Sequence, residues 1–347
     1  MDVLLLILSF LVILIGAELF TNGIEWFGRK LELAEGAVGS VLAAVGTAMP
    51  ETMIPLIAIT LGGGVAASEV GVGAILGAPF MLSTLAMFVT GSAVFLLRKR
   101  RASHEDLVVD TGVLGHDLAY FFGTYGFAVG VALLPVELEW ARRGASILLL
   151  AAYAWYVVGH LRAEAVEEAK LAPLRFHRLD RRAPGHPAPP RLRIVTVQVL
   201  FALACIVGGA WGFVHAVQGL ASVLGLDGRL LALVIAPIAT ELPEKLNSVI
   251  WVRQGKDTLA MGNITGAMVF QSAIPTSVAL LFAPTLWSVG GAGVAFASAG
   301  MTFASSAAIL LPMLARRRLD ARVLMVGGIF YALYVGVVIA TLASSPG

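Results

Sequence analysis

Apolar residues fill long, almost unbroken stretches of this chain, and charged residues collect in the segments between them. A helix needs about 20 consecutive, mainly apolar residues to cross the hydrocarbon core of a lipid bilayer. Stretches of about this length occur ten times in the sequence: 3–22, 36–61, 71–97, 111–134, 141–160, 194–218, 230–252, 258–282, 288–313 and 322–343. The pattern predicts an all-α membrane protein with ten transmembrane helices.

The composition agrees with this pattern and excludes a soluble domain. Hydrophobic residues make up 58% of the 347 positions and charged residues 13%, whereas about a quarter of the residues in a soluble domain are charged. The formal net charge of +2 gives no indication of a nucleic acid partner. We therefore expect the lipid bilayer, and no nucleic acid, among the partners; the sequence leaves the oligomeric state open.

The basic residues lie almost entirely on one side of the predicted membrane. Twenty lysines and arginines follow the first, third, fifth, seventh and ninth apolar stretches, three lie in the other loops, and Lys245 alone lies inside a span. Loops rich in lysine and arginine stay in the cytoplasm. We expect a multi-pass protein of the cell inner membrane with both termini outside the cytoplasm.

Two of the apolar stretches contain a proline followed by a glutamate, at Pro50-Glu51 and at Pro243-Glu244. Inside a helix, proline has no N–H to donate, so Pro50 leaves the carbonyl of Gly46, and Pro243 that of Ala239, without a helical partner. Free carbonyls and a carboxylate persist at membrane depth only where they are buried in protein or line a wet cavity. The motifs therefore indicate an ion or substrate site, the alternative being two structural kinks.

The Pro-Glu stretches belong to an internal duplication. An offset of 193 residues pairs Gly16–Phe20 with Gly209–Phe213 and Thr47–Glu51 with Thr240–Glu244, and an offset of 189 pairs Gly73–Ala78 with Gly262–Ala267. Each unit holds five predicted helices, and an odd number turns the second unit upside down in the membrane. We expect two inverted five-helix repeats with broken Pro-Glu helices, at 1–160 and 193–347, joined by a cytoplasmic linker at 161–192.

The polar groups of the two broken helices and of the helix after the second one offer oxygen atoms. Hard cations such as Ca²⁺ and Na⁺ prefer oxygen ligands, and the sequence has no His/Cys cluster of the kind that zinc or copper prefers. We expect no resident cofactor, only transported Ca²⁺ and Na⁺ or H⁺. The candidate ligands are Glu51, Glu241, Glu244, Thr47, Thr240, Asn263, Gln271 and the carbonyls of Gly46 and Ala239.

Charges near the second motif refine this site. Glu241 and Lys245 are four residues apart on one predicted helix and can neutralise each other, which leaves Glu51 and Glu244 as two negative charges facing one another. Two carboxylates held close together can also share a proton. Such a site could exchange a metal ion for protons or sodium. Elsewhere, Asp117 near the start of the fourth stretch fits either a water-exposed interfacial residue or a proton relay.

These motifs resemble the two alpha repeats of the sodium/calcium exchanger family of calcium:cation antiporters. The similarity lies in Gly46–Glu51 and Ala239–Glu244, each followed by a glycine-rich segment at Gly73–Ala78 or Gly262–Ala267. The resemblance implies a secondary-active antiporter that exchanges Ca²⁺ for Na⁺ or H⁺ by alternating access. It also implies that Glu51 and Glu244 are the central ligands and that Thr47, Thr240 and Gln271 support them.

The chain departs from the family pattern at several candidate ligands. Where the family usually has serine after threonine, this chain has Ala48 and Glu241. On the following helix the family has serine and, four residues later, Asn or Asp; this chain has Ala78 and Leu82 in one repeat and Ala267 and Gln271 in the other. The first repeat therefore offers fewer side-chain oxygens than the second.

Other functions are compatible with parts of this pattern. The missing oxygens of the first repeat motivate a non-transporting membrane receptor or scaffold that keeps the fold, or an antiporter for a different cation. An ion channel is a further alternative, although inverted repeats around a central acid pair favour a carrier. We expect no enzyme, because the sequence shows no Ser/His/Asp arrangement or metal-dyad spacing of an intramembrane hydrolase.

Overall fold

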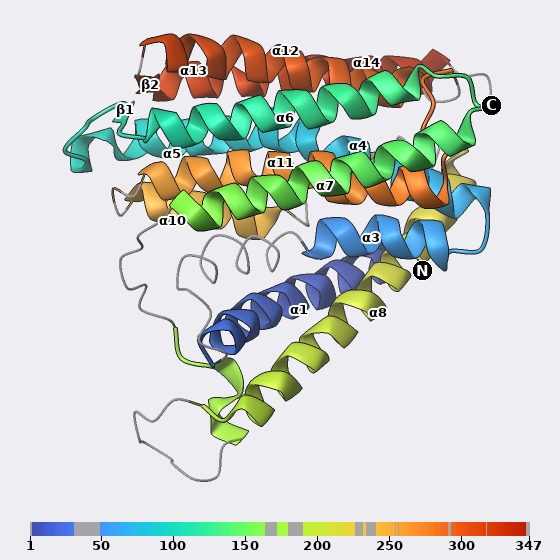
Figure 1. The fold of residues 1–347 in the computed structure, drawn as a ribbon, viewed down its shortest axis with the longest axis horizontal. Helices are drawn as coiled ribbons and strands as arrows, with labels where there is room; N and C mark the ends of the chain where they lie inside the picture. The colour runs from blue at the N-terminus through green and yellow to red at the C-terminus, as the bar shows by residue number, and fades with distance from the viewer. Residues whose placement is uncertain are drawn as a thin grey trace.

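The structure is a computed structural model, and it describes residues 2–30, 49–163, 172–179, 190–225, 232–233, 241–253, 255, 257–290, 293–316 and 318–344. The described chain is almost entirely helical (Figure 1), as predicted. Its main helices are α1 (Asp2–Lys30), α3 (Met49–Thr60), α4 (Val65–Met81), α5 (Met87–Leu97), α6 (Thr111–Ala132), α7 (Glu139–Ala163), α8 (Leu192–Leu224), α10 (Leu242–Arg253), α11 (Asp257–Phe282), α12 (Gly293–Arg316), α13 (Ala321–Met325) and α14 (Gly327–Ser344).

Short elements join these helices. A π-helical turn, η2 (Leu82–Ala86), links α4 to α5, and 3₁₀ turns lie at η3 (Arg98–Arg100) and η4 (Arg175–Leu179). Two-residue strands β1 (Asp106–Leu107) and β2 (Leu319–Asp320) pair antiparallel, with Asp106 opposite Asp320.

Long apolar helices identify an integral, multi-pass membrane protein. Within the described residues, six helical segments are both long and apolar enough to cross a bilayer: Asp2–Phe20, Val65–Arg100, Leu192–Leu224, Ala260–Phe282, Gly293–Arg316 and Ala321–Thr341. Helices α6 and α7 are long as well, but they do not meet the same standard of length and apolarity. The total of ten spans stays a prediction.

Helix α11 runs through the middle of the bundle and packs against α3, α4, α6, α7 and α10. Hydrogen bonds of hydroxyl groups connect α11 to its neighbours. The hydroxyl of Ser272 lies 2.7 Å from the hydroxyl of Thr124 in α6, and the hydroxyl of Ser277 donates to the carbonyl of Ser146 in α7. Ser248 of α10 donates to the carbonyl of Ala260. Such bonds between helices add to packing in lipid, where there is little hydrophobic drive to associate.

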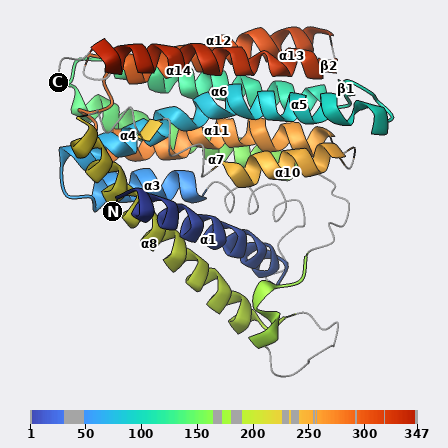
Figure 2. The ribbon, with the colours of Figure 1, turned by 180° about the vertical axis from the view of Figure 1, so that it is seen from behind.

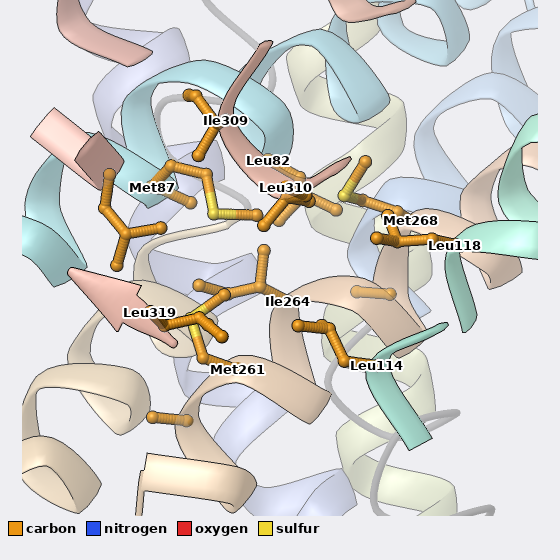
Figure 3. Packing of buried hydrophobic residues seen from close by; sticks show 14 of the residues in the cluster. Leu82, Met87, Leu114, Leu118, Met261, Ile264, Met268, Ile309, Leu310 and Leu319 are labelled. Carbon is orange, nitrogen blue, oxygen red and sulfur yellow. The ribbon is translucent and has the colours of Figure 1, made fainter. Parts of the chain in front are cut away.

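Apolar side chains fill the space around the first half of α11 (Figure 3). Met261, Ile264 and Met268 of α11 meet Leu114 and Leu118 of α6. Residues from η2, α5, α12 and β2 complete this fully buried cluster: Leu82, Met87, Ile309, Leu310 and Leu319. Close contact of this kind stabilises a membrane bundle through dispersion forces, which fixes α11 against its neighbours.

Helices α1 and α8 form an extensively packed pair that is tilted away from the rest of the bundle in Figures 1 and 2. The two helices run antiparallel, because Asp2 lies beside Gly219 while Gly23 lies beside Val199. Glycines bring the two backbones close together: a Cβ atom at Gly16 would lie 3.0 Å from the carbonyl oxygen of Ala202. The pair joins the bundle mainly through contacts of α8 with α3 and α4.

The basic loops that follow α5, α10 and α12 lie at the β1–β2 end of the molecule (Figure 1), opposite both chain termini. Buried Arg101 connects two of them: it forms a 2.6 Å ion pair with Asp257 and donates to the carbonyls of Val252 and Asp106. At the other end, buried Arg142 donates to the carbonyls of Leu134, Pro284 and Trp287. The structure thus gathers three basic loops at one end of the bundle.

Candidate cation-binding site

The second Pro-Glu motif lies at the beginning of a helix, and the first lies where the described part of α3 starts. Glu51 is the third described residue of α3 (Met49–Thr60), and α10 begins at Leu242, directly after Glu241. The N–H of Lys245 donates to the carbonyl of Glu241 over 3.1 Å, which closes the first turn of α10. Proline fits a first turn well, and the N-terminus of a helix favours a nearby carboxylate. Helix α10 thus starts at its motif, where we had expected proline inside a longer helix; for Pro50 the residues before Met49 lie outside the described part of the chain, and the expectation stays a prediction.

The glutamates that begin these two helices are buried. Glu51 is 5% exposed and Glu241 is fully buried, and the two carboxylates are close enough to repel each other electrostatically. Helix α11 packs against both α3 and α10, and it carries Gln271 near its middle, with 1% exposure. Burying charged groups this deeply is costly unless other groups or ions compensate them. The three side chains are therefore the candidate ligands of a cation site where these helices meet.

Lys245 forms an ion pair with Glu241 at the side of this site. Its Nζ lies 3.2 Å from Oε2 of Glu241, and its side chain is 6% exposed. This agrees with the prediction that these two residues, one helical turn apart, neutralise each other. Oε1 of Glu241 accepts no hydrogen bond from any side chain or backbone group in the described part of the chain.

Gln271 is buried with an open hydrogen-bonding capacity. Neither its amide oxygen nor its amide nitrogen has a hydrogen-bond partner among the described residues. Its backbone is irregular as well, because Pro275 lacks the N–H that the carbonyl of Gln271 would receive in a helix. The hydroxyl of Thr276 donates to that carbonyl over 3.3 Å instead. Buried polar groups are normally paired, so this amide is well suited to bind an ion or water.

Two further prolines near the site were not recognised as important from the sequence. Pro55 follows Glu51 by four residues, and Pro275 follows Gln271 by the same distance. Each proline therefore removes the helical donor from the carbonyl of a candidate ligand. The signal was present in the sequence as a proline four residues after a polar residue in an apolar stretch.

The repeat relation extends to the backbone around Gln271. At the offset of 189 residues, Gln271 and Pro275 correspond to Leu82 and Ala86, the two ends of the π-helical turn η2. Ser305 of α12 donates to the carbonyl of Ser83 within this turn. Both repeats thus interrupt the regular helix at the same place, one with a proline and one with a π turn, which is frequent at functional sites.

Several of the predicted ligands lie beyond what the structure describes. Gly46, Thr47, Ala239 and Thr240 are outside the described residues, and the description of Glu244 covers only its backbone, in the first turn of α10. Their participation stays a prediction. Asn263 is half-buried in α11, and eight residues separate it from Gln271, or about 12 Å along a helix.

A second buried carboxylate lies beside α11. Asp117 of α6 is 1% exposed and accepts hydrogen bonds from the hydroxyls of Tyr156 in α7, over 2.8 Å, and Thr265 in α11, over 2.6 Å. The ring of His116 stacks on Tyr156 with the ring centroids 5.7 Å apart. The interpretation of Asp117 as a water-exposed interfacial residue is therefore wrong. Its partners lie on helices far apart in the sequence, which local patterns could not reveal.

Comparison with known proteins agrees with this architecture. The model of the family described as "Sodium/calcium exchanger protein" matches residues 1–161 and 194–343. CaxA of Alkalimonas amylolytica, named as a candidate antiporter, is 26% identical over 289 residues, which cover 82% of each chain.

Solved structures of exchangers are similar as well. The fold resembles the crystal structure of the H⁺/Ca²⁺ exchanger CAX, with a TM-score of 0.73 and 17% identity over 99% of this chain and 88% of that one. It also resembles the sodium-calcium exchanger NCX_Mj, with a TM-score of 0.53 and 17% identity over 99% of both chains. The family match covers most of the sequence, so this chain belongs to the sodium/calcium exchanger family and is a cation antiporter, not an enzyme.

Proposed function

We propose that this antiporter exchanges Ca²⁺ for Na⁺ or H⁺ by alternating access at a midplane site between α3, α10 and α11. The observation that carries the proposal is the burial of Glu51 in α3 and of Glu241 next to the start of α10, together with the buried Gln271 of α11, which packs against both helices. The amide of Gln271 has no hydrogen-bond partner among the described residues. Two buried carboxylates are unfavourable in a membrane unless enough positive charge compensates them. A cation bound between them would compensate their charge and complete the hydrogen bonding of the amide.

We further propose that the chain forms ten spans as two inverted five-helix repeats in the cell inner membrane, with both termini outside. Support comes from the α1–α8 interface. Gly16 lies against Ile206, and its repeat counterpart Gly209 lies against Ile13, the counterpart of Ile206. An axis of approximate twofold symmetry would relate two such contacts, since equivalent residues then exchange roles. Gathering of the basic loops at the end away from the termini supports the orientation.

The ligands we assign to the site are all oxygen donors. Ca²⁺ takes six to eight oxygen ligands from carboxylates, carbonyls, amides and water. Glu51, Glu241 and Gln271 would supply side-chain oxygens, while Glu244, Thr47, Thr240 and the carbonyls of Gly46 and Ala239 would complete the shell. Asn263 lies about 12 Å along α11 from Gln271, so we place it on the path from the basic end of the molecule to the site.

The neighbouring proteins support Ca²⁺ as the cargo. The structures of CAX and NCX_Mj are described as an H⁺/Ca²⁺ exchanger and a sodium-calcium exchanger. Paired carboxylates suit either counter-ion, because they bind a divalent cation when both are ionised and bind Na⁺ or protons when it leaves. The competition of these ions for one site would couple their movements.

Uptake of ⁴⁵Ca²⁺ into reconstituted vesicles tests this function. An outward sodium gradient and an outward proton gradient are imposed separately, with an ionophore for the tested ion as the control that removes its gradient. We expect one gradient to drive uptake that saturates with Ca²⁺. Absence of gradient-driven Ca²⁺ uptake under both conditions would contradict the proposal, and uptake that never saturates would indicate a channel.

A further inference from the structure

The ion pair between Glu241 and Lys245 lies within the candidate site itself. Lys245 is the one lysine or arginine of the predicted spans that lies away from their ends, and its Nζ is 3.2 Å from the fully buried Glu241. Replacing a buried ion pair by apolar residues is often neutral or stabilising, because removing two charges from water is costly. Stability alone therefore gives a weak reason for this pair.

The other repeat shows that the fold does not need the pair. At the offset of 193 residues, Glu241 corresponds to Ala48 and Lys245 corresponds to Thr52. Helix α3 nevertheless holds its Pro-Glu motif in a helix without this pair, as α10 does with it. The acid and the base are an addition to one repeat, next to the carboxylate of Glu51, whose charge acts on Glu241.

The pair changes the number of charges that a bound ion must balance. The two Pro-Glu motifs and Glu241 contribute three carboxylates, and Lys245 contributes one positive charge, so the site has a net charge of about −2 when all four are ionised. One divalent cation, or two monovalent cations, would neutralise it. Without the lysine, a third positive charge would be needed.

We infer that the ammonium group of Lys245 permanently balances one of the three negative charges of the site. It thereby limits the transported ions bound at one time to a total of two positive charges. The inference rests on the proposed function of the site. It follows that one Ca²⁺ exchanges for two monovalent ions and that a transport cycle moves no net charge. Removal of the lysine opens the site to a third monovalent ion, so that each cycle then moves one net charge.

Vesicles with a clamped membrane potential test this inference. Wild type, Lys245→Met, Glu241→Gln and the double variant E241Q/K245M are reconstituted, and the ⁴⁵Ca²⁺ distribution is measured at equilibrium with a fixed gradient of the counter-ion. One net charge per cycle shifts the Ca²⁺ ratio about fifty-fold for each 100 mV. Lys99→Met, which removes an exposed lysine outside the spans, is the matched control.

The expected results differ between the variants. Wild type, K99M and E241Q/K245M, whose site keeps a charge of about −2, should show no dependence on the potential, and K245M should show the fifty-fold shift. E241Q alone should lose Ca²⁺ uptake about tenfold or more, and adding K245M should raise uptake above that of E241Q. A dependence on the potential in wild type, or its absence in transporting K245M, would overturn the inference.

Variants that do not transport remain informative. If K245M is folded but inactive, displacement of bound ⁴⁵Ca²⁺ by Na⁺ or H⁺ is measured instead. Its Hill coefficient should rise from about two in wild type to about three in K245M, and an unchanged Hill coefficient overturns the inference. If K245M does not fold, the comparison of E241Q with the double variant decides, and a double variant no better than E241Q overturns it. Ca²⁺ exchange by wild type tests the proposed function separately, since it can succeed while every one of these comparisons fails.

Discussion

The backbone of Gly209 in α8 lies directly against Ile13 in α1. A Cβ atom at position 209 would be 2.7 Å from Cγ1 of Ile13 and 3.0 Å from the carbonyl oxygen of Ser9. The neighbouring Gly208 has nothing within 4 Å of the same position. The close approach of α1 and α8 therefore depends on one of two adjacent glycines, which gives a matched pair of substitutions.

We predict that Gly209→Ala destabilises the protein and that Gly208→Ala does not. Overpacking at a close contact costs about 1–3 kcal/mol, whereas alanine in an open helical position gains up to about 1 kcal/mol over glycine. Thermal unfolding of both variants in the same detergent checks the prediction. Equal melting temperatures would show that the two helices separate without cost, and the packing described for α1 and α8 would be wrong.

The segment 172–179 is fixed to the α1–α8 pair by two buried amides. Asn22 donates to the carbonyls of Ala172 and Pro173 and accepts from the N–H of Arg175, and Gln198 accepts from the N–H of Phe176. Glu18 adds an exposed ion pair with Arg175, at 2.7 Å. The amides hold the backbone, whereas exposed ion pairs contribute little.

We predict that Asn22→Ala accelerates tryptic cleavage after Arg175 about tenfold, since each lost hydrogen bond contributes about 0.5–1.5 kcal/mol to holding the segment. Limited proteolysis of the purified protein, followed by mass spectrometry, measures the rate. Glu18→Gln is the control and should change it less than about threefold. Equal rates for N22A and wild type would mean that the segment is not held in place by Asn22.

Asp117 joins three helices, and its removal should have a larger effect than removal of one donor. Asp117→Ala takes away the acceptor of both Tyr156 and Thr265. We expect it to lower the free energy of unfolding by about 3–5 kcal/mol, because buried groups are left unpaired. Tyr156→Phe removes one bond and should cost about 1.5–3 kcal/mol. Melting temperatures that rank these variants in the opposite order would contradict the role assigned to Asp117.

The ion pair between Asp106 of β1 and Arg318, which directly precedes β2, predicts that stability depends on pH in the acid range. Arg318 donates to both carboxylate oxygens of Asp106, over 2.9 and 2.5 Å, and this lowers the pKa of Asp106 below its ordinary value. Because the folded pKa is depressed, the contact stabilises the protein fully above the unfolded pKa of about 3.9. Its contribution is lost as the pH falls through the lowered folded pKa.

We therefore expect Asp106→Asn to be less stable than wild type at neutral pH and to lose less stability between about pH 5 and pH 3. Melting temperatures measured across this range check the difference. Glu137→Gln, which removes an exposed acid from the opposite end of the molecule, should keep the wild-type profile. A parallel pH profile for D106N and wild type would show that the ion pair contributes nothing to folding.

The helical class could be predicted because long apolar stretches leave few other structures in a membrane. The ion pair of Glu241 with Lys245 could also be predicted, since four residues make one helical turn. Burial of Glu51 and Gln271 followed from the cost of exposing polar groups to lipid.

Other features depend on contacts that no local pattern contains. The segment Leu82–Ala86 contains neither proline nor glycine, so nothing in it predicts a π turn. The position of Asp117 depends on Thr265, 148 residues away. Docking of residues 172–179 on α1 depends on side chains about 150 residues away, and a polar composition alone predicted only a linker.

Transport by Glu51→Gln and Glu244→Gln, measured as initial ⁴⁵Ca²⁺ uptake into vesicles beside Glu137→Gln as the control, tests the site most directly. Each site variant should lose uptake by about tenfold or more, because a neutral amide removes one of the charges that hold the cation, while E137Q should transport like wild type. Full uptake by both E51Q and E244Q would contradict the account.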